Sequence, residues 1–88
     1  MAWTVEYTET AKVQLRKLDK PIAHRVMDFM GERVAATDDP RQIGKALTGQ
    51  FSGLWRYRVG DVRVICTIED GALRVLVVRI GNRREVYR

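Results

Sequence analysis

The chain has 88 residues, 45% of them apolar, and a formal net charge of +5. This length accommodates one domain with one modest hydrophobic core, and it excludes a multidomain enzyme. No apolar stretch approaches the roughly 18 residues of a bilayer-spanning helix, and the N-terminus lacks the pattern of a signal peptide. The single cysteine, Cys66, cannot form an internal disulfide and is expected to be a buried thiol. We therefore expect one domain over residues 1–88, without a membrane segment, in the cytoplasm.

The first half of the chain predicts a strand followed by two helices. Residues 2–7 alternate large apolar with small or charged side chains, which is typical of a half-buried strand. Apolar residues then recur at three- and four-residue spacing, which predicts a helix over about residues 9–18 with Thr8 as its N-cap. A turn at Pro21 begins a second apolar stripe, which predicts a helix to about Ala36. Two amphipathic helices joined by so short a turn are expected to form an antiparallel hairpin.

The second half changes to the periodicity of strands. Residues 40–50 are poor in apolar side chains and are expected to cross the surface as a linker. Strands are then predicted over residues 51–59, 62–69 and 72–80, separated by Gly60-Asp61 and Asp70-Gly71. Both dipeptides are signals for two-residue hairpin turns. The predicted fold is α+β with the order β-α-α-β-β-β, an antiparallel sheet covered by a helical hairpin.

The positive charge is confined to the second half of the chain. Residues 1–43 hold seven Lys or Arg against seven Asp or Glu, whereas residues 44–88 hold nine against four. A basic half-domain favours a polyanionic partner, most simply nucleic acid. The alternative is a surface charge that only keeps the protein soluble.

Arginines gather on one face of the predicted hairpin. A two-residue turn places Arg58 opposite Arg63, and Arg56 lies two residues before Arg58 on the same face. Like charges directly opposite each other destabilise a sheet, so three cations on one face favour an anion-binding site. The alternative, which we favour for Arg74 and Arg79, is that such side chains lie along the open sheet and pair with carboxylates of the helices.

The residues after the last predicted strand add to this chemistry. Residues 81–88 contribute three arginines and a tyrosine, Tyr87. Arginine binds phosphate oxygens in pairs of hydrogen bonds, and a phenol can transfer a proton. The hairpin and the tail together therefore predict a site for a phosphodiester. The alternative for Tyr87 is a packing role that pins the tail to the sheet.

Other chemistries have few residues to carry them. His24 is the only histidine, and no second histidine or cysteine lies at metal-ligand spacing from it. The segment Gly44-Lys45-Ala46 lacks the upstream glycine and the hydroxyl of a phosphate-binding loop. We therefore expect neither a metal nor a cofactor. Trp55 and Tyr57 alternate with the arginines, so they are expected in the core rather than as stacking platforms for bases.

Nearly the whole chain resembles the RelE family of bacterial toxins, within the RelE/ParE superfamily. The more specific part of the resemblance lies in two segments, Leu54-Trp55-Arg56-Tyr57-Arg58-Val59-Gly60-Asp61-Val62-Arg63-Val64 and Arg79-Ile80-Gly81-Asn82-Arg83-Arg84-Glu85-Val86-Tyr87. The catalytic set of the family is a pair of alternating basic residues, an arginine after the following turn, an arginine after the last strand and a tyrosine near the C-terminus. By resemblance, the catalytic residues here are Arg56, Arg58, Arg63, Arg83 and Tyr87.

The resemblance implies a ribosome-dependent endoribonuclease. Members of the family enter the ribosomal A site and cleave messenger RNA without a metal, using the 2′-hydroxyl of the RNA as nucleophile and leaving a 2′,3′-cyclic phosphate. Arg63 and Arg83 suit the phosphoryl oxygens. Some relatives have lysine in place of Arg56 and Arg58, and an arginine does not readily act as a base. Either Tyr87 transfers the proton, or positioning and charge stabilisation carry the rate.

The resemblance also implies a partner and leaves two other activities open. A toxin of this kind is held silent by a cognate antitoxin, expected to wrap the apolar surface with an extended or helical segment and to cover or displace the tail. One alternative activity is inhibition of DNA gyrase by a ParE-like toxin, and the other is RNA binding without cleavage. The arginine and tyrosine of residues 83–87 favour the ribonuclease.

Overall fold

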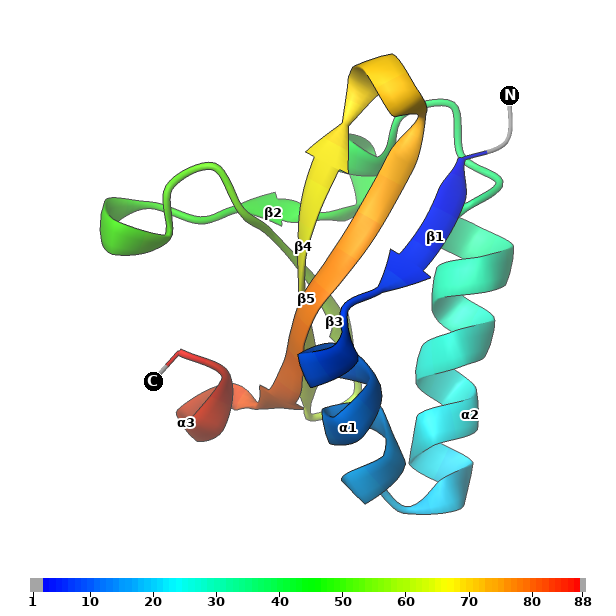
Figure 1. Cartoon of the computed structure of the whole chain (residues 1–88), viewed down its shortest axis with the longest axis vertical. Helices are drawn as coiled ribbons and strands as arrows, with labels where there is room; N and C mark the ends of the chain where they lie inside the picture. The colour runs from blue at the N-terminus through cyan, green and yellow to red at the C-terminus, as the bar shows by residue number, and fades with distance from the viewer. Residues whose placement is uncertain (1–2, 88) are drawn as a thin grey trace.

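The computed structural model describes residues 3–87, so Met1, Ala2 and Arg88 lie outside the described part of the chain (Figure 1). Its helical elements are α1 (Glu9–Lys17), α2 (Lys20–Asp28), a π-helical continuation η1 (Phe29–Val34) and a short α3 (Arg83–Val86). Its strands are β1 (Thr4–Tyr7), β2 (Lys45–Ala46), β3 (Trp55–Val59), β4 (Val62–Glu69) and β5 (Arg74–Asn82). Three short 3-10 turns complete the chain, η2 (Pro40–Ile43), η3 (Gly49–Phe51) and η4 (Asp70–Ala72).

The five strands form one sheet in the order β1-β5-β4-β3-β2. The β2–β3, β3–β4 and β4–β5 pairs are antiparallel, whereas β1 pairs with β5 in parallel. The predicted α+β fold is confirmed, and the parallel edge pair departs from the wholly antiparallel sheet expected. The alternation within residues 4–7 shows that a strand forms, but it carries no information about the direction of a partner far along the chain.

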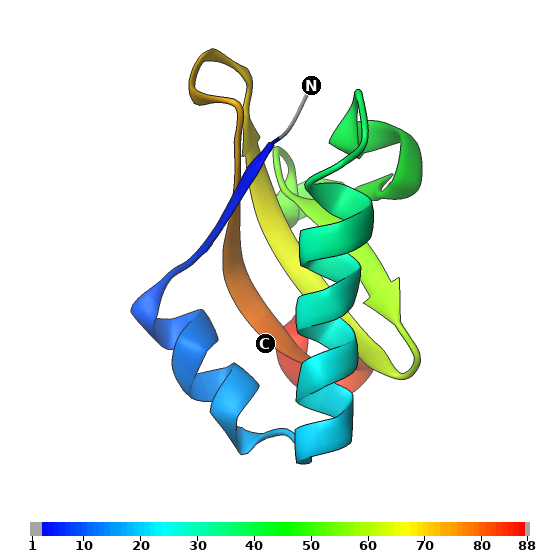
Figure 2. The same cartoon turned by 90° about the vertical axis from the view of Figure 1, so that its right-hand side faces the viewer.

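The helices cover one face of the sheet and bury the core there. Figure 2 shows α2 and η1 standing in front of the strands, and α1 and α2 run in opposite directions, as expected for the hairpin. Thr8 caps α1 as predicted, accepting a hydrogen bond from the Ala11 amide at 3.1 Å. The fully buried apolar side chains are Ala11, Val26, Met30 and Val34 from the helices, and Tyr57, Val64, Cys66, Val75 and Val77 from the sheet. Burial raises the pKa of the Cys66 thiol, in keeping with an unreactive core residue.

One predicted hairpin turn is correct and the other is wrong. Gly60 has a φ of +59° and Val59 pairs with Val62, as a two-residue turn requires. At Asp70-Gly71, in contrast, Glu69 pairs with Arg74, so residues 70–73 form a longer connection that includes η4. This register places Val75 opposite Ile68 on the core face, and the core packing therefore overrides the local turn signal. As a result, β5 begins and ends two residues later than predicted.

The segment before β3 also differs from the prediction. Residues 45–46 form the short edge strand β2 within the expected linker, and β3 begins at Trp55 rather than at residue 51. Gly49 and Gly53 have φ values of +65° and +93°, so the backbone turns between them instead of extending. Among residues 3–87, no helix is both long and apolar enough to cross a membrane.

Candidate active site

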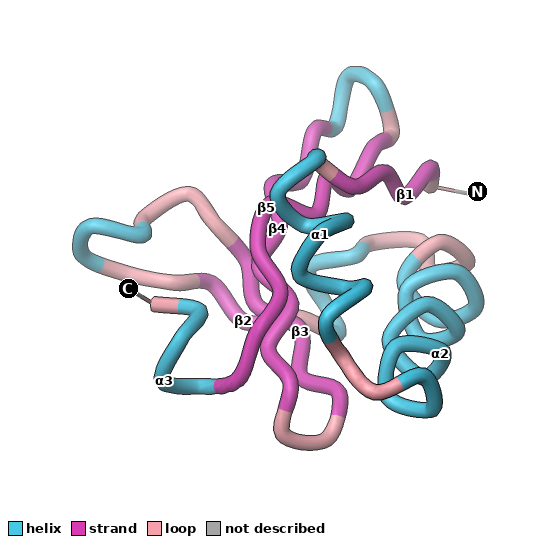
Figure 3. Tube along the Cα trace, turned by 60° about the horizontal axis from the view of Figure 1, so that its bottom comes forward, coloured by secondary structure: helices cyan, strands magenta, loops and turns pink. Residues whose placement is uncertain are grey.

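Figure 3 shows that α1 and α2 lie on one side of the sheet and leave its other face open. The strand register places basic residues on that open face. Arg58 pairs with Arg63 across β3 and β4, as predicted. Arg56 pairs with Ile65, and Ile65 pairs in turn with Arg79 of β5. Because directly opposed residues share a face of a sheet, these side chains lie on one side. We call this surface the cationic face and define it by Lys45, Arg56, Arg58, Arg63 and Arg79.

Lys45 extends the cationic face to the sheet edge, because it pairs directly with Arg56. Lys45 was not predicted as a site residue, since a strand of two residues has no period and lies within the predicted linker. Arg79 was predicted to pair with carboxylates, as was Arg74. Arg74 indeed binds carboxylates, those of Glu69 at 2.5 Å and Glu6 at 3.2 Å, although both belong to strands rather than helices. Arg79 instead lies on the cationic face.

The arginines of the hairpin differ in their surroundings. Arg58 is exposed, whereas Arg63 is only 8% exposed and its Nη1 donates a hydrogen bond to the Gly60 carbonyl at 3.5 Å. Arg56 is half-buried, and its Nε is buried without a hydrogen-bond partner among residues 3–87. A buried donor left unpaired costs about 1–3 kcal/mol. The Nε of Arg74 is buried without a partner in the same way although its guanidinium binds two carboxylates, so this feature alone does not mark an anion site.

The tail folds back over the end of the cationic face. The Asn82 side chain caps α3 by accepting hydrogen bonds from the amides of Arg84 and Glu85, at 3.0 and 3.1 Å. Val86 is buried against Gly81, where an added Cβ would lie 3.7 Å from the Val86 Cβ. Gly81 pairs with Arg63 across β4 and β5, so the tail lies on the same side as the hairpin arginines.

This path brings two of the predicted catalytic arginines together. One hollow is lined by Asp61, Arg63, Asn82, Arg83 and Arg84. Three guanidinium groups line this hollow, that of Arg63 from β4 and those of Arg83 and Arg84 from α3, beside the carboxylate of Asp61. Arg58 pairs with Arg63 across the two strands but does not line the hollow. No role for Arg84 was predicted from the sequence. Such a group of guanidiniums is suited to the several oxygens of a phosphodiester.

Tyr87 is held by its ring and its backbone. The ring packs edge-on against Phe51 of η3, with 5.6 Å between the ring centroids. The preceding carbonyl, that of Val86, accepts a hydrogen bond from Arg79 Nη1 at 3.2 Å. Both the predicted packing role and a chemical role remain compatible with this placement, because the hydroxyl is not used in either contact. The structure therefore ties Tyr87 to the cationic face through Arg79.

The other two tyrosines are less suited to proton transfer. Burial raises the pKa of Tyr57, and its hydroxyl donates a hydrogen bond to the Pro40 carbonyl at 2.8 Å. Burial also raises the pKa of Tyr7. Tyr57 is a core residue, as predicted, and Trp55 is half-buried with the Arg41 guanidinium 5.8 Å from its ring. His24 is exposed on α2, and no cluster of three or more His, Cys, Asp or Glu side chains in the described part of the chain could hold a metal ion.

Comparison with known proteins identifies the family. The model of the family described as ParE toxin of type II toxin-antitoxin system, parDE, matches residues 5–87. Toxin RelG of Mycobacterium tuberculosis is 31% identical over 88 residues, which cover 100% of this chain and 99% of RelG. The chain belongs to the RelE family of type II toxins.

Two further relatives support this assignment. Toxin RelE of M. tuberculosis is 34% identical over 84 residues, covering 96% of this chain and 84% of that toxin. The crystal structure of the toxin-antitoxin complex RelBE2 from M. tuberculosis contains a chain that superposes with a TM-score of 0.86 at 28% identity, covering 97% of this chain and 95% of that chain. The resemblance inferred from the two arginine-rich segments is thereby confirmed, and this chain is a RelE-family toxin along its whole described length.

Proposed function

We propose that this toxin is a metal-independent endoribonuclease that cleaves messenger RNA in the ribosomal A site. The observation that carries the proposal is the hollow at which Arg83 of the tail joins Arg63 of the hairpin, beside Arg58. The proposed catalytic residues are Arg56, Arg58, Arg63, Arg83 and Tyr87. The sequence matches to toxin RelG and toxin RelE of M. tuberculosis cover 100% and 96% of this chain, which supports the choice of a RelE-type activity.

The proposed reaction is an internal transfer of the phosphodiester. The 2′-oxygen of the RNA loses its proton and attacks the neighbouring phosphorus, while the bond from phosphorus to the 5′-oxygen breaks. The departing 5′-oxygen takes up a proton, and a 2′,3′-cyclic phosphate remains. Negative charge grows on the phosphoryl oxygens during this step, where Arg63 and Arg83 would bind them from two sides of the hollow. Removing one such donor typically lowers the rate by about 10²–10³-fold.

The hairpin arginines have distinct proposed roles. Arg56 would bind a phosphate oxygen through the outer nitrogens of its guanidinium, because it lies on the cationic face in one row with Ile65 and Arg79. Arg58 is exposed beside Arg63, so it would add charge at the edge of the phosphate. Neither guanidinium can serve as a base near neutral pH, since an arginine side chain keeps its proton in proteins.

Tyr87 is the proposed proton-transfer group. It is half-buried at the border of the cationic face, whereas Tyr7 and Tyr57 have pKa values raised by burial. A phenol at this place can accept the proton of the 2′-hydroxyl or supply one to the leaving oxygen. Lys45 would bind the backbone of a neighbouring nucleotide rather than the scissile phosphate. It lies on the edge strand β2, which β3 and β4 separate from β5, the strand that leads into the tail.

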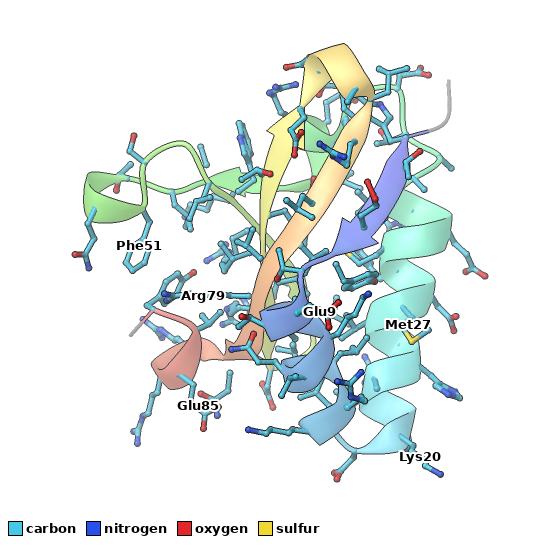
Figure 4. The ribbon with its side chains drawn as sticks, viewed as in Figure 1. Glu9, Lys20, Met27, Phe51, Arg79 and Glu85 are labelled. Atoms are coloured by element: carbon cyan, nitrogen blue, oxygen red, sulfur yellow. The ribbon has the colours of Figure 1, made fainter. Side chains whose placement is uncertain are left out.

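The proposed partners are a cognate antitoxin, the ribosome and messenger RNA, and the proposed place of action is the cytoplasm. The M. tuberculosis structure that this chain resembles is a toxin–antitoxin complex, which supports an antitoxin for this chain too. Val13 and Met27 are exposed large apolar side chains on α1 and α2, and Met27, labelled on α2 in Figure 4, lines a hollow together with Leu15 of α1. An antitoxin segment that covers them would bury apolar surface that water now contacts.

The decisive experiment maps the 5′ ends of a messenger RNA after addition of purified toxin, with the RNA free or bound in ribosomes with an empty A site. We expect cuts inside A-site codons only in the ribosome-bound RNA, and their loss in the Arg83→Ala variant. Arg16→Ala is the matched control, since Arg16 is an exposed arginine of α1 outside the cationic face. Folded wild-type toxin that produces no cuts in either setting would refute the proposal.

A second candidate function is inhibition of DNA gyrase. The description of the matching family names the ParE toxin, which favours this alternative. It predicts that the purified toxin blocks supercoiling by gyrase in vitro and leaves ribosome-bound RNA intact. Binding of RNA that falls steeply with salt, without cuts and without an effect on gyrase, would instead indicate a non-catalytic RNA-binding module.

A further inference from the structure

We propose that Arg79 and Phe51 are positioning residues that hold Tyr87 at the cationic face. The inference rests on the proposed ribonuclease function, because it concerns the residue that transfers the proton. Neither residue belongs to the catalytic set implied by the family. They come from different elements, β5 and η3: Arg79 contacts Val86, and Phe51 contacts Tyr87.

The tail needs anchors from outside itself. α3 has only four residues, and a helix of this length is not stable on its own. Its Asn82 cap fixes where α3 begins, and Val86 is its one buried residue. Tyr87 follows the end of α3 with a φ of −100° and a ψ of 10°, so no helical hydrogen-bond ladder continues through it. The orientation of Tyr87 therefore depends on what the Val86–Tyr87 segment touches.

Arg79 is placed to fix the backbone of that segment. It lies in one cross-strand row with Ile65 and Arg56, about 10 Å from the β3 backbone, since neighbouring strands are about 4.8 Å apart. Its Nη1 donates a hydrogen bond to the Val86 carbonyl at 3.2 Å, directly before Tyr87. A charged donor bound to a carbonyl gives a strong and directional contact. Figure 4 shows Arg79 extending from β5 to the C-terminal segment.

Phe51 is placed to fix the ring. The left-handed residues Gly49 and Gly53 turn the chain on both sides of it, and Figure 4 shows Phe51 directed from this loop toward the tail. Its ring meets that of Tyr87 at 5.6 Å and 62°, an edge-to-face arrangement that restricts the rotation of both rings. Arg79 holds the backbone before Tyr87 and Phe51 holds its ring, so the direction of the Tyr87 hydroxyl is fixed by two contacts that do not involve the hydroxyl itself.

The test is a double-mutant cycle on cleavage of ribosome-bound RNA under single-turnover conditions. Arg79→Ala and Phe51→Ala should each lower the maximal rate by about 10–100-fold with little change in KM, because misplacing a catalytic group affects the chemical step. In a Tyr87→Phe background the same two substitutions should lower the maximal rate by less than about threefold, since the hydroxyl that these residues position is already absent. Arg79→Lys and Phe51→Tyr, which keep the charge and the ring, should restore most of the rate.

Three results would overturn the proposal. Losses that multiply in the Tyr87→Phe background would mean that Arg79 binds the phosphate itself and that Phe51 acts on another group. A Tyr87→Phe toxin as active as the wild type would mean that there is no hydroxyl to position. Single variants with wild-type rates would show that the contacts do not matter. Gln50→Ala is the matched control for the loop, since Gln50 is exposed next to Phe51.

Hydrogen exchange separates this inference from the proposed function. In Arg79→Ala and Phe51→Ala, the amides of residues 83–87 should exchange faster than in the wild type while those of β4 keep their protection. Faster exchange in a toxin that cuts no RNA would refute the ribonuclease and keep the anchoring of the tail. Unchanged exchange in an active toxin would refute the anchoring and keep the ribonuclease.

Discussion

The cationic face should make the toxin less stable than a neutral sheet of the same shape. Arg58 stands directly opposite Arg63, and Lys45 stands directly opposite Arg56, so the sheet contains two like-charged cross-strand pairs. Such pairs are destabilising by about 0.2–1 kcal/mol each. We predict that Arg58→Gln, which keeps much of the side-chain volume and removes one charge, raises the free energy of unfolding by about 0.5 kcal/mol.

The same substitution should lower activity. For a domain of this size, about 1 kcal/mol corresponds to about 4–8 °C in Tm, so the expected rise is about 2–4 °C. Cleavage of ribosome-bound RNA should fall by about 10-fold or more, because a cation beside the phosphate is lost. Thermal unfolding at low salt and cleavage kinetics on the same preparation measure the two effects. Arg16→Gln on α1 is the control, with an expected Tm change of less than about 2 °C.

Salt provides the check on the physical reason. In about 1 M salt the Debye length falls to about 3 Å, so the repulsion between Arg58 and Arg63 is screened and the stability gain of Arg58→Gln should largely disappear. A gain that persists in high salt would show that the charge is not its cause. A lower Tm for Arg58→Gln at low salt would refute the reasoning outright, because it would mean that the aliphatic part of Arg58 contributes packing that exceeds the repulsion.

Three further predictions concern the site and the surface. Arg83→Ala should lower kcat/KM for ribosome-bound RNA by about 100-fold, measured by the rate of A-site cuts, and a loss below about threefold would remove Arg83 from the site. Lys45→Ala should reduce the slope of log affinity against log salt for single-stranded RNA by about 0.7, and an unchanged slope would mean that Lys45 touches no phosphate. The hydrogen bond from Arg41 lowers the pKa of Asp70, so its stabilising effect is present above the ordinary pKa of an aspartate and is lost as pH falls through the lowered value. Asp70→Asn should therefore make Tm decrease less steeply as the pH is lowered. The same decrease of Tm in Asp70→Asn and in the wild type would show that this ion pair does not stabilise the fold.

The sequence predicted those parts of the site that depend on local pattern. Two-residue periodicity on both sides of Gly60-Asp61 was enough to place Arg58 opposite Arg63, because a two-residue turn allows only one register between the strands that it joins. The N-cap at Thr8 and the core position of Tyr57 were equally local. Such features depend on residues that lie close together in the sequence.

The parts that the sequence did not predict depend on contacts between distant segments. The direction of β1 is decided by β5, and three other strands and both long helices lie between them in the chain. The longer connection after Glu69 is decided by which core residues face each other. The contacts of Phe51 and Arg79 exist only because the tail folds back over the sheet, and no periodicity in residues 81–88 encodes that return.

The parallel pairing of β1 with β5 has a consequence for how the toxin is made. Thr4 pairs with Arg74, so β1 cannot pair with its neighbour in the sheet until β5 has been synthesised. Long-range pairings of this kind slow folding, because the intervening chain must be ordered before the contact forms. We therefore expect the sheet to close only after residues 74–82 have left the ribosome. Until then the tail that follows β5 has no completed sheet to pack against, so the proposed site would be absent from the nascent chain.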